Sequence, residues 1–590
     1  MTNRKIIYKP IAPEVEELVQ EHGNQSESVL EILTELDRRG HLSTETIADT
    51  ARALGIPAQQ VYGMATFYSM LSLQPRQNVL RVCDGPVCWL KRASNQLPAL
   101  SAAEGSVNSY QSPVEMWGKV MSGKDWTVER TSCLGLCDRA PAVMVNDEQA
   151  GPVTPEEAAK VCAGWRGVPT DYSMPRTGEV RVMLAGAGKI DPDSIVSAIE
   201  HGTYDGLKSA LQKTPEQVIA EVKDAGLQGR GGAGFPAGVK WEICRKVPGM
   251  PKYIICNADE SEPLIFKDRV LIDTNPHQIL EGMAIAGYAC GAKEAWVYIR
   301  GEYEYQARRL ERAIEQAEAR GFLGKNVLDG RFSFRIHVHR GAGAYICGEE
   351  TALIESLEGR RGEPRLRPPY PPTYGFRGRP TVVNNVETFA AVSHILRNGA
   401  EWWQSRSSYT NTPGTKLYMV IGHVKTPGLF EAPFGLTLRQ VIEEFSGGML
   451  PGSEFKCALT GGAAGTIVNA KLLDVPLDYT SARQGISLGI GAFLVCDQRV
   501  SVVSLLRELL RFFTAETCGK CVPCRVGTTR SFEILSRMTE GNGRAGDVAE
   551  LETLSENMLL ASFCGLGQAV SIPMNSAMSN FAEEFEQEEK

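Results

Sequence analysis

The sequence contains no hydrophobic run long enough to cross a membrane. The best candidate, Leu488 to Cys496, has the length of one strand, whereas a transmembrane helix needs about 20 successive apolar residues. Basic residues are not in excess either: the net charge is −8 at pH 7 and the isoelectric point is about 5.7. A nucleic-acid-binding face requires clustered positive charge. We therefore expect neither direct insertion into a membrane nor a nucleic-acid ligand.

Histidine is scarce, and signals for export are missing. The chain has 8 histidines among 590 residues, and His337 and His339, which alternate on a predicted strand, are expected to be structural. The first residues reach Pro10 without an apolar core or a cleavage site, so we expect a cytoplasmic protein. A hydrophobic content of 43% and a charged content of 22% are typical of globular proteins, and the length allows several domains.

Cysteine, in contrast, is frequent and occurs in two ordered sets. Near the C-terminus, Cys518, Cys521 and Cys524 form a Cys-x2-Cys-x2-Cys motif, and Cys564 follows at a distance. Three thiolates on one loop with a remote fourth are typical of a [4Fe–4S] cluster. Structural zinc is the alternative, although zinc sites usually combine two Cys-x2-Cys pairs. This pattern predicts an iron–sulfur electron carrier.

The second set lies near the other end of the chain. Cys83 and Cys88 form one short pair, and Cys133 and Cys137 form another. Two such pairs suit the thiolates of a [2Fe–2S] cluster, while two disulfides are the alternative in an exported protein. The remaining cysteines stand in apolar surroundings, so we expect them to be buried small hydrophobic residues. They are Cys162, Cys244, Cys256, Cys290, Cys347, Cys457 and Cys496.

Apolar spacing and turn residues divide the chain into an ordered series of parts. Residues 1–76 are predicted to be helical, residues 77–165 to hold two short strands that deliver the cysteine pairs to adjacent loops, and residues 166–180 to form a linker. Residues 181–412 alternate helices with strands, expected at 252–256, 295–299 and 334–338, which predicts an α/β sheet. A small β-rich module at 413–497 and a helical tail at 498–590 complete the multidomain α/β chain.

A glycine-rich loop, Gly229 to Pro236, fits the pattern G-x-G-x-x-G. A dinucleotide-binding turn follows a strand, whereas the preceding residues 215–225 are polar and predicted to be helical, so we do not expect a Rossmann turn. The loop still offers bare backbone N–H groups to a phosphate or a flavin, and Arg230 and Lys240 supply positive charge. A purely structural glycine turn is the alternative.

Further polar clusters follow along the chain. Asn257 to Pro263 comes after a predicted buried strand, and its carboxylates and amide are costly to bury unless they bind something. Gly341 to Glu350 is a second glycine loop, and it leads into a predicted helix at 351–357 whose N-terminus suits a polar ligand. Arg365, Arg367 and Tyr370 come next, and then Asn384-Asn385. We interpret these clusters together as one cofactor site.

In this order the motifs resemble those of the NADH-binding flavoprotein subunit of respiratory complex I over residues 180–590. Residues 12–165 resemble its 24-kDa-type [2Fe–2S] companion, which has a thioredoxin-like fold. Fused chains of this kind are similar to diaphorase (β) subunits of soluble NAD-dependent formate dehydrogenases and NAD-reducing hydrogenases. The resemblance implies bound FMN, a nicotinamide site beside it and electron exit through the clusters. It also implies a Rossmann-like flavin domain, a ubiquitin-like β-grasp module and a helical [4Fe–4S] domain.

Motif positions carry the family's cofactor residues over to this chain. The resemblance assigns FMN to Gly229, Gly231, Lys240, Asn257, Asp259, Gly348, Glu349, Asn384 and Asn385. It assigns the dinucleotide pocket to Phe235, Glu262, Glu350, Arg367 and Tyr370, with Phe235 or Tyr370 stacking on adenine and Glu262 accepting from ribose or amide groups. Arg230, Glu260 and Tyr345 complete the cofactor-binding set. One departure is Leu264-Ile265, where the family usually has glycine and a small hydroxyl residue.

Flavin chemistry sets what else the chain requires. Hydride exchange between flavin and nicotinamide needs no side-chain acid or base, so we expect no catalytic residue. No pterin or nickel–iron ligand set is identifiable, and a partner subunit must therefore act on the substrate. We expect a molybdenum- or tungsten-pterin formate dehydrogenase α subunit, in a dimer of heterodimers. A hydrogenase diaphorase, a fused complex I subunit and a flavin-free iron–sulfur relay are the alternatives.

Overall fold

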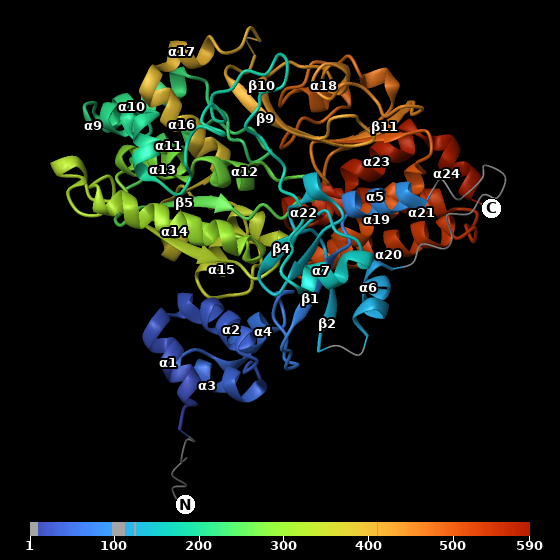
Figure 1. The fold of residues 1–590 in the computed structure, drawn as a ribbon, viewed down its shortest axis with the longest axis horizontal. Helices are drawn as coiled ribbons and strands as arrows, with labels where there is room; N and C mark the ends of the chain where they lie inside the picture. The colour runs from blue at the N-terminus through green and yellow to red at the C-terminus, as the bar shows by residue number, and fades with distance from the viewer. Residues whose placement is uncertain (1–9, 97–111, 123–124, 410, 590) are drawn as a thin grey trace, which may run out of the picture.

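The computed structural model describes residues 10–96, 112–122, 125–409 and 411–589 (Figure 1). Its first part is a set of helices, α1 (Pro13–His22), α2 (Val29–Arg38), α3 (Thr44–Leu54) and α4 (Ala58–Ala65), as predicted. Ser43 starts α3, since its hydroxyl accepts the N–H of Thr46 at 3.2 Å. The apolar faces of these helices join a core that includes Tyr253 and Leu353 of the central domain. The N-terminal helices are therefore packed against that domain.

The second part is a four-stranded sheet in the order β2-β1-β3-β4. It comprises β1 (Val79–Cys83), β2 (Thr127–Thr131), β3 (Val143–Val145) and β4 (Glu148–Ala150), with α5 (Pro86–Gln96), α6 (Pro113–Met121) and α7 (Ala158–Cys162). β1 pairs with β2 in parallel and with β3 antiparallel. The two strands predicted from the sequence, at 79–82 and 142–145, are confirmed as β1 and β3. Cys162 contradicts its prediction, because it lies at the end of α7 and is exposed.

The central domain contains a parallel sheet, β5 (Tyr253–Ala258), β6 (Glu294–Ile299), β7 (Arg335–Arg340) and β8 (Thr381–Asn385), in the order β7-β6-β5-β8. Three of these strands were predicted, and β8 carries the Asn384-Asn385 motif at its end. Because all four strands are parallel, their carboxyl ends meet at one edge. The helices are α8 (Ile195–Glu200), α9 (Asp205–Leu211), α10 (Pro215–Asp224), α11 (Ala237–Lys246), α12 (Lys267–Thr274), α13 (Pro276–Cys290), α14 (Glu304–Ala319), α15 (Glu350–Leu357), α16 (Val386–Asn398) and α17 (Ala400–Gln404).

The β-rich module forms a five-stranded mixed sheet, at the upper right of Figure 1. Its strands are β9 (Thr415–Gly422), β10 (Gly428–Pro433), β11 (Phe455–Thr460), β12 (Thr466–Val468) and β13 (Ala492–Asp497), in the order β10-β9-β13-β11-β12. The first and last strands, β9 and β13, pair in parallel at the centre, and α18 (Leu438–Glu443) accompanies them. This topology is that of a β-grasp, as the resemblance implied.

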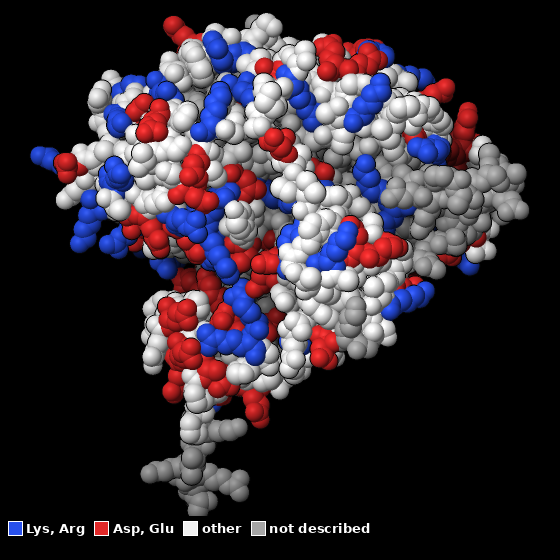
Figure 2. All heavy atoms as spheres, in the orientation of Figure 1, with Lys and Arg blue, Asp and Glu red and all other residues white. Residues whose placement is uncertain are grey.

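The chain ends in helices, as predicted: α19 (Val502–Glu516), α20 (Val522–Thr539), α21 (Asp547–Ala561), α22 (Gly565–Ala569), α23 (Ser571–Asn580) and α24 (Ala582–Glu588). Cys564 lies in the turn between α21 and α22. Within the described residues, no helix is both long and apolar enough to cross a bilayer. Figure 2 shows acidic and basic side chains interspersed over the face drawn.

Candidate functional site

A cavity of about 1150 Å³ opens at the carboxyl edge of the parallel sheet. Segments that are far apart in the sequence meet there: both glycine loops, the acidic stretch after β5 and the amide pair at the end of β8. Of the predicted cofactor residues, all but Arg230 line this cavity. They are Gly229, Gly231, Phe235, Lys240, Asn257, Asp259, Glu260, Glu262, Tyr345, Gly348, Glu349, Glu350, Arg367, Tyr370, Asn384 and Asn385.

The Arg230 side chain points away from the cavity, contrary to its predicted role as a cation for the ligand. It is fully buried and donates to the carbonyl oxygens of Gln228 at 2.8 Å and Thr415 at 3.0 Å. Its guanidinium also lies 4.8 Å from the ring centroid of Phe434. Glu387 lies 3.9 Å from its Nε, and the bond to Thr415 joins the glycine loop to the β-grasp module instead.

The first glycine loop reaches the cavity through a backbone that other residues would not adopt. Gly234 has φ +67, and a Cβ there would lie 2.5 Å from the ring of Tyr479. As expected, the loop follows a helix, α10, and leads into α11. On α11, Lys240 donates to the carbonyl oxygen of Val383 at 3.0 Å and lies 3.7 Å from Glu350. A loop of bare N–H groups beside a lysine fits a phosphate-bearing cofactor.

Asn257, near the end of β5, and Asp259, directly after it, face the second glycine loop. The Asn257 side-chain amide donates to the carbonyl oxygen of Gly348 at 2.8 Å, which ties the two motifs together. Burial raises the pKa of Asp259 to about 7, although the Ser261 hydroxyl donates to its carboxylate at 2.8 Å. Uncharged in part near neutral pH, Asp259 has the chemistry to both donate to and accept from a flavin edge.

Glu260 lines the cavity but also holds a helix. Its carboxylate accepts the N–H groups of Asp268 at 2.7 Å and Arg269 at 3.0 Å, at the start of α12. The Tyr303 hydroxyl donates to it at 3.0 Å. Burial, reinforced by the charge of Asp268, raises the pKa of Glu260 to about 7. Glu260 therefore connects the cavity wall to α12.

Glu262 bonds to the β-grasp module. Its carboxylate accepts the N–H of Ala464, in the turn between β11 and β12, at 3.2 Å, and burial raises its pKa to about 7. The unusual residues that follow shape the wall here. Leu264 is fully buried with φ +80, a conformation that glycine adopts more easily, and Ile265 lines the cavity. The departure from the family pattern thus replaces small residues with an apolar wall.

The second glycine loop ends at a capped helix. Glu349 accepts the N–H groups of Thr351 at 3.0 Å and Ala352 at 2.9 Å, which starts α15. Arg367 lies 3.5 Å from Glu349 and 3.4 Å from Glu350. At the mouth of the cavity, Phe235 is 48% exposed and Tyr370 is 54% exposed, so both rings are open to stacking by a planar ligand.

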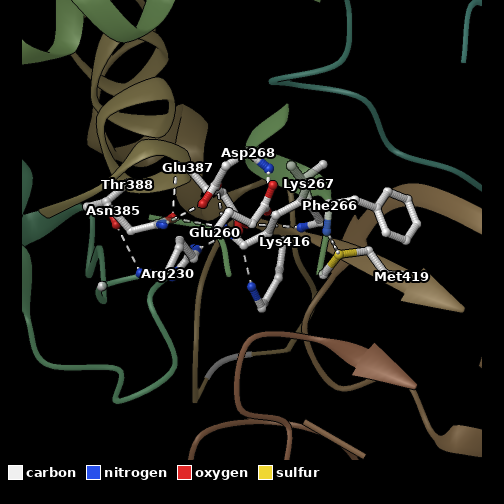
Figure 3. A network of polar contacts seen from close by, with 12 residues as sticks. Arg230, Glu260, Phe266, Lys267, Asp268, Asn385, Glu387, Thr388, Lys416 and Met419 are labelled. Atoms are coloured by element: carbon white, nitrogen blue, oxygen red, sulfur yellow. Dashed lines mark hydrogen bonds and ion pairs between the residues drawn. The ribbon is translucent and has the colours of Figure 1, made fainter. Parts of the chain in front are cut away.

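A buried ionic network lies behind this edge of the cavity (Figure 3). Lys267 donates to Asp268 at 2.6 Å and to the Asn385 side-chain oxygen at 2.8 Å, and it lies 3.1 Å from Glu387. Lys416 of β9 lies 3.2 Å from Glu387. Burial lowers the pKa of Lys416 to about 8, while both lysines keep the pKa of Glu387 below its usual value against the effect of burial. The network orients Asn385 and attaches the β-grasp module to α16.

The cavity also has walls that the motifs did not predict. Asp268 lies shortly after the Asn257–Pro263 stretch, and Thr388 lies shortly after Asn384-Asn385. Their closeness to these motifs in the sequence could have indicated that they line the cavity. Ile490 comes from the β-grasp module, and Gly565, Leu566 and Ala569 come from α22, and no local pattern pointed to them. The other unpredicted lining residues are Ala233, Gly234, Ile243, Ile265, Ile346, Pro372, Thr373 and Val383.

The first cysteine set gathers at the carboxyl ends of β1 and β2. Cys83 ends β1, Cys88 lies on α5, and Cys133 and Cys137 lie on the loop after β2; all four are buried and none is in a disulfide. The sulfur atoms of Cys133 and Cys137 are 3.8 Å apart. Hydrogen bonds with Cys133 and Cys88 lower the pKa of the Cys83 thiol well below its usual value, whereas neighbouring thiols and burial raise the pKa values of Cys88 and Cys133.

The second set surrounds the loop between α19 and α20. Cys518 and Cys521 are half-buried, while Cys524 and Cys564 are buried. Lys520 lies 4.6 Å from the centroid of the Phe563 ring, which connects the loop to the turn of Cys564. Among the described residues no three His, Cys, Asp or Glu side chains converge to hold one metal ion. An iron–sulfur cluster binds its thiolates through different iron atoms and does not need such convergence.

Comparison with known proteins identifies the parts. Residues 15–166 match a thioredoxin-like [2Fe–2S] ferredoxin, residues 222–394 the Nuo51 FMN-binding domain, and residues 504–588 the iron–sulfur binding region of NADH-ubiquinone oxidoreductase-F. The F 2 component of the NADH-quinone oxidoreductase from Rhizobium meliloti (strain 1021) is 45% identical over 386 residues, 65% of this chain and 91% of the relative. The chain belongs to this family of NADH-binding flavoprotein subunits.

Two further relatives extend the comparison to hydrogenases. The HndC component of the NADP-reducing hydrogenase of Solidesulfovibrio fructosivorans is 45% identical over 409 residues, 69% of this chain and 83% of the relative. A chain of the NAD+-reducing [NiFe]-hydrogenase, in its air-oxidised crystal structure, superposes with a TM-score of 0.81 and 31% identity, covering 97% of this chain and 95% of that one. The shared architecture therefore includes the N-terminal fusion.

The predicted fold class and cofactors are confirmed by these matches. This flavoprotein subunit of NAD-dependent oxidoreductases combines an FMN-binding domain with [2Fe–2S] and [4Fe–4S] domains. The structure places both cysteine sets and the glycine loops where such groups fit: thiols that are not in disulfides, and a cavity lined by both glycine loops and by polar side chains such as Lys240 and Asn257. The zinc, disulfide and flavin-free alternatives do not account for these matches.

Proposed function

We propose that the chain is a diaphorase subunit, which exchanges a hydride with NAD(H) and passes electrons singly between its flavin site and a catalytic partner. The observation that carries this proposal is the shared wall of the cavity. Cys564 directly precedes α22, and Gly565, Leu566 and Ala569 of α22 line the cavity beside the glycine loops. Cys564 is thus followed directly by a residue that lines the cavity, so an electron has a short path between the flavin site and the four-iron site.

In this proposal the residues of the cavity bind and orient FMN and the nicotinamide dinucleotide. FMN, when bound, accepts a hydride from the nicotinamide and releases electrons one at a time. Lys240 and the first glycine loop bind the flavin phosphate, and Asn257 and Asp259 bond to its polar edges. Phe235 and Tyr370 stack on the dinucleotide at the mouth, and Glu262 accepts from its ribose. Leu566, an apolar residue of the cavity wall, would exclude water from the side of the cavity next to Cys564.

We further propose that electrons leave through an apolar surface next to the four-iron site. Val522 is 60% exposed and Val526 51%, one turn apart on α20, directly after Cys521. Leu559 and Leu560, 46% and 74% exposed, end α21 shortly before Cys564. Exposed apolar side chains beside half-buried cluster ligands suit a partner subunit that carries its own electron acceptor.

For the catalytic partner we propose a molybdenum- or tungsten-pterin formate dehydrogenase, as expected from the sequence. An NAD-reducing hydrogenase is the second candidate. The observation that supports this second candidate is the similarity along nearly the whole chain to the NAD+-reducing [NiFe]-hydrogenase. The cytoplasmic location and the dimer of heterodimers belong to the same proposal. The partner decides the substrate, because the chain itself supplies the nicotinamide half of the reaction.

The test uses the anaerobic complex purified from its source with this chain as bait. NADH should bleach the flavin and produce two reduced iron–sulfur EPR signals. Formate alone should reduce the same clusters if the first partner is correct, and hydrogen alone if the second is correct. Failure of NADH to reduce the flavin would contradict the diaphorase role, whereas reduction by neither formate nor hydrogen would contradict both partners.

A further inference from the structure

One helix, α19, supports more than one cofactor site. It packs against α5, which carries Cys88, and both helices lie together in Figure 1. Near its C-terminal end, the Arg511 guanidinium donates to the backbone oxygen of Asp84 at 2.9 Å, one residue after Cys83. The helix therefore contacts the two-iron site directly, although its own chain continues to the four-iron site.

The same end of α19 reaches the flavin cavity. The Phe512 ring packs against the ring of Tyr345, with 5.0 Å between centroids, and Tyr345 lines the cavity. Tyr345 is the first residue of the short turn Tyr345–Gly348 in the second glycine loop. A displacement of α19 would consequently shift this wall of the cavity.

Glu516, the last residue of α19, bonds to two cofactor loops at once. Its carboxylate accepts the backbone N–H of Tyr345 at 2.8 Å across 171 residues of sequence. Burial raises the pKa of the same carboxyl group, and a hydrogen bond with the side chain of Ser132, directly before the ligand Cys133, lowers it. Glu516 itself precedes the ligand Cys518 by two residues. One side chain thus joins the flavin wall, the two-iron loop and the four-iron loop.

Glu516 is half-buried, so its carboxylate loses part of its hydration and needs these bonds in exchange. Glu302 lies close enough to repel it, and Arg300 offsets part of that repulsion. A hydrocarbon side chain would fill the space without electrostatic cost but would leave the Tyr345 N–H without an acceptor. What the carboxylate adds is two acceptor oxygens for donors on separate loops.

We infer that Glu516 is a positioning residue for internal electron transfer, because its hydrogen bonds hold the three cofactor loops at a constant separation. This inference rests on the proposed diaphorase function. Electron transfer between protein-bound carriers slows steeply with distance, so loosening the loops should slow transfer from flavin to clusters. It should not slow the reaction of the flavin with NADH, because Glu516 bonds only to the backbone N–H of Tyr345 in this wall, whereas Lys240, Asn257 and Glu262 are held by other contacts.

The experiment compares Glu516→Ala, Glu516→Gln and the unmodified full chain, each with FMN and iron content measured. Glutamine keeps an acceptor for Tyr345, and its amide can donate to the Ser132 hydroxyl, so it should restore what alanine loses. In rapid mixing with NADH, alanine should slow cluster reduction by about tenfold, as a small misplacement can. Glutamine should recover most of that loss. NADH-to-dye activity and FMN content should be unchanged in both.

Glu533 provides the matched control, because its side chain is 56% exposed on α20 in the same domain. Glu533→Ala should leave cluster reduction unaltered. Equal slowing by alanine and glutamine at position 516 would contradict the inference and point to charge instead of hydrogen bonding. Unchanged cluster reduction in both variants, or loss of FMN or iron in both, would also overturn it. Absence of flavin reduction by NADH in the unmodified chain would instead contradict the proposed function.

Discussion

The two iron–sulfur sites are built in opposite ways. All four cysteines of the two-iron site are buried, on loops that follow strands of a small sheet. At the four-iron site, Cys518 and Cys521 are half-buried on a short loop between two helices, near exposed apolar side chains. One site is enclosed by protein, while the other reaches the surface.

The polar contacts around the two sites also differ, and the enclosed two-iron site has more of them to the central domain. The central domain grips the two-iron loop: Arg300 donates to the carbonyl oxygen of Cys133 at 2.5 Å, and Arg269 to that of Gly135 at 3.2 Å. The four-iron loop combines a bond to the central domain, from Lys520 to the carbonyl oxygen of Pro364 at 2.8 Å, with one inside its own domain, from Arg525 to the carbonyl oxygen of Gly519. An enclosed cluster exchanges electrons through the protein, whereas an exposed one is available to a partner.

Removing a ligand of the exposed site should have the largest effect. Cys564→Ser should abolish the four-iron EPR signal and reduce electron delivery to the partner to background, because the exit route is lost. Dye reduction by NADH should persist, since the flavin can discharge directly to a small acceptor. The measurements are EPR, iron content and both activities.

Cys162→Ser is the control, as Cys162 is exposed and distant from both sets in sequence. It should retain every signal. Loss of dye reduction at full FMN content in Cys564→Ser would show that the four-iron cluster is more than an exit route.

The enclosed site should be sensitive to a single methyl group. Gly135 has φ +68, and a Cβ there would lie 2.0 Å from the Tyr303 hydroxyl. Gly135→Ala should therefore destabilise the two-iron loop by about 2–4 kcal/mol and weaken the [2Fe–2S] EPR signal. In the same domain, a Cβ at Gly118 would meet nothing within 4 Å, so Gly118→Ala should be nearly neutral. Equal thermal stability and equal EPR signals in both variants would contradict the close packing of the two-iron loop against Tyr303.

Accessibility should distinguish the two clusters without any mutation. An iron chelator added to the oxidised chain should remove iron from the four-iron site several-fold faster than from the two-iron site, because two of its thiolates are half-exposed. The decay of each EPR signal after reduction measures the two rates. Faster loss from the two-iron site would mean that its burial does not protect it.

The smallest effect concerns the flavin cavity. Burial raises the pKa of Glu262 to about 7, so its carboxylate ionises as pH rises through neutrality and then becomes the stronger acceptor. The KM for NADH should accordingly fall between about pH 6 and about pH 8. Glu262→Gln should flatten this profile, weaken NADH binding by about 1 kcal/mol and relax discrimination against NADPH, with FMN retained.

Steady-state kinetics with an artificial acceptor measure both nucleotides, alongside flavin content. Asp171→Asn, at a carboxylate of the linker, is the control and should keep the wild-type profile. An unaltered pH profile in Glu262→Gln, or loss of FMN, would show that Glu262 serves only its bond to Ala464.

Many features of this molecule could be predicted because its cofactor-binding residues occur in short sequence motifs. The spacing of Cys518, Cys521 and Cys524 lies within one loop, where sequence distance sets spatial distance. Strands such as β5 and β6 were predicted because they are buried runs of apolar residues. The polar residues at strand ends were grouped correctly since parallel strands end at one edge.

The predictions failed for side chains whose surroundings are set by residues distant in the sequence. Arg230 stands in a glycine loop, and its charge suggested a ligand contact, but acceptors from the β-grasp module were closer. Cys162 has apolar neighbours in sequence, yet it ends the short α7 on the exposed side. In both cases the deciding atoms belong to the fold and not to the local sequence.

The sequence by itself predicted which cofactors the chain carries, because ligand type and local spacing define those groups; the assignment of individual cysteines to the clusters stays a prediction. Tertiary structure alone decided that α22 forms a wall of the flavin cavity, that Glu516 joins three loops, and that one cluster is enclosed while the other reaches the surface. These are contacts between segments hundreds of residues apart, and no local spacing encodes a distance of that kind.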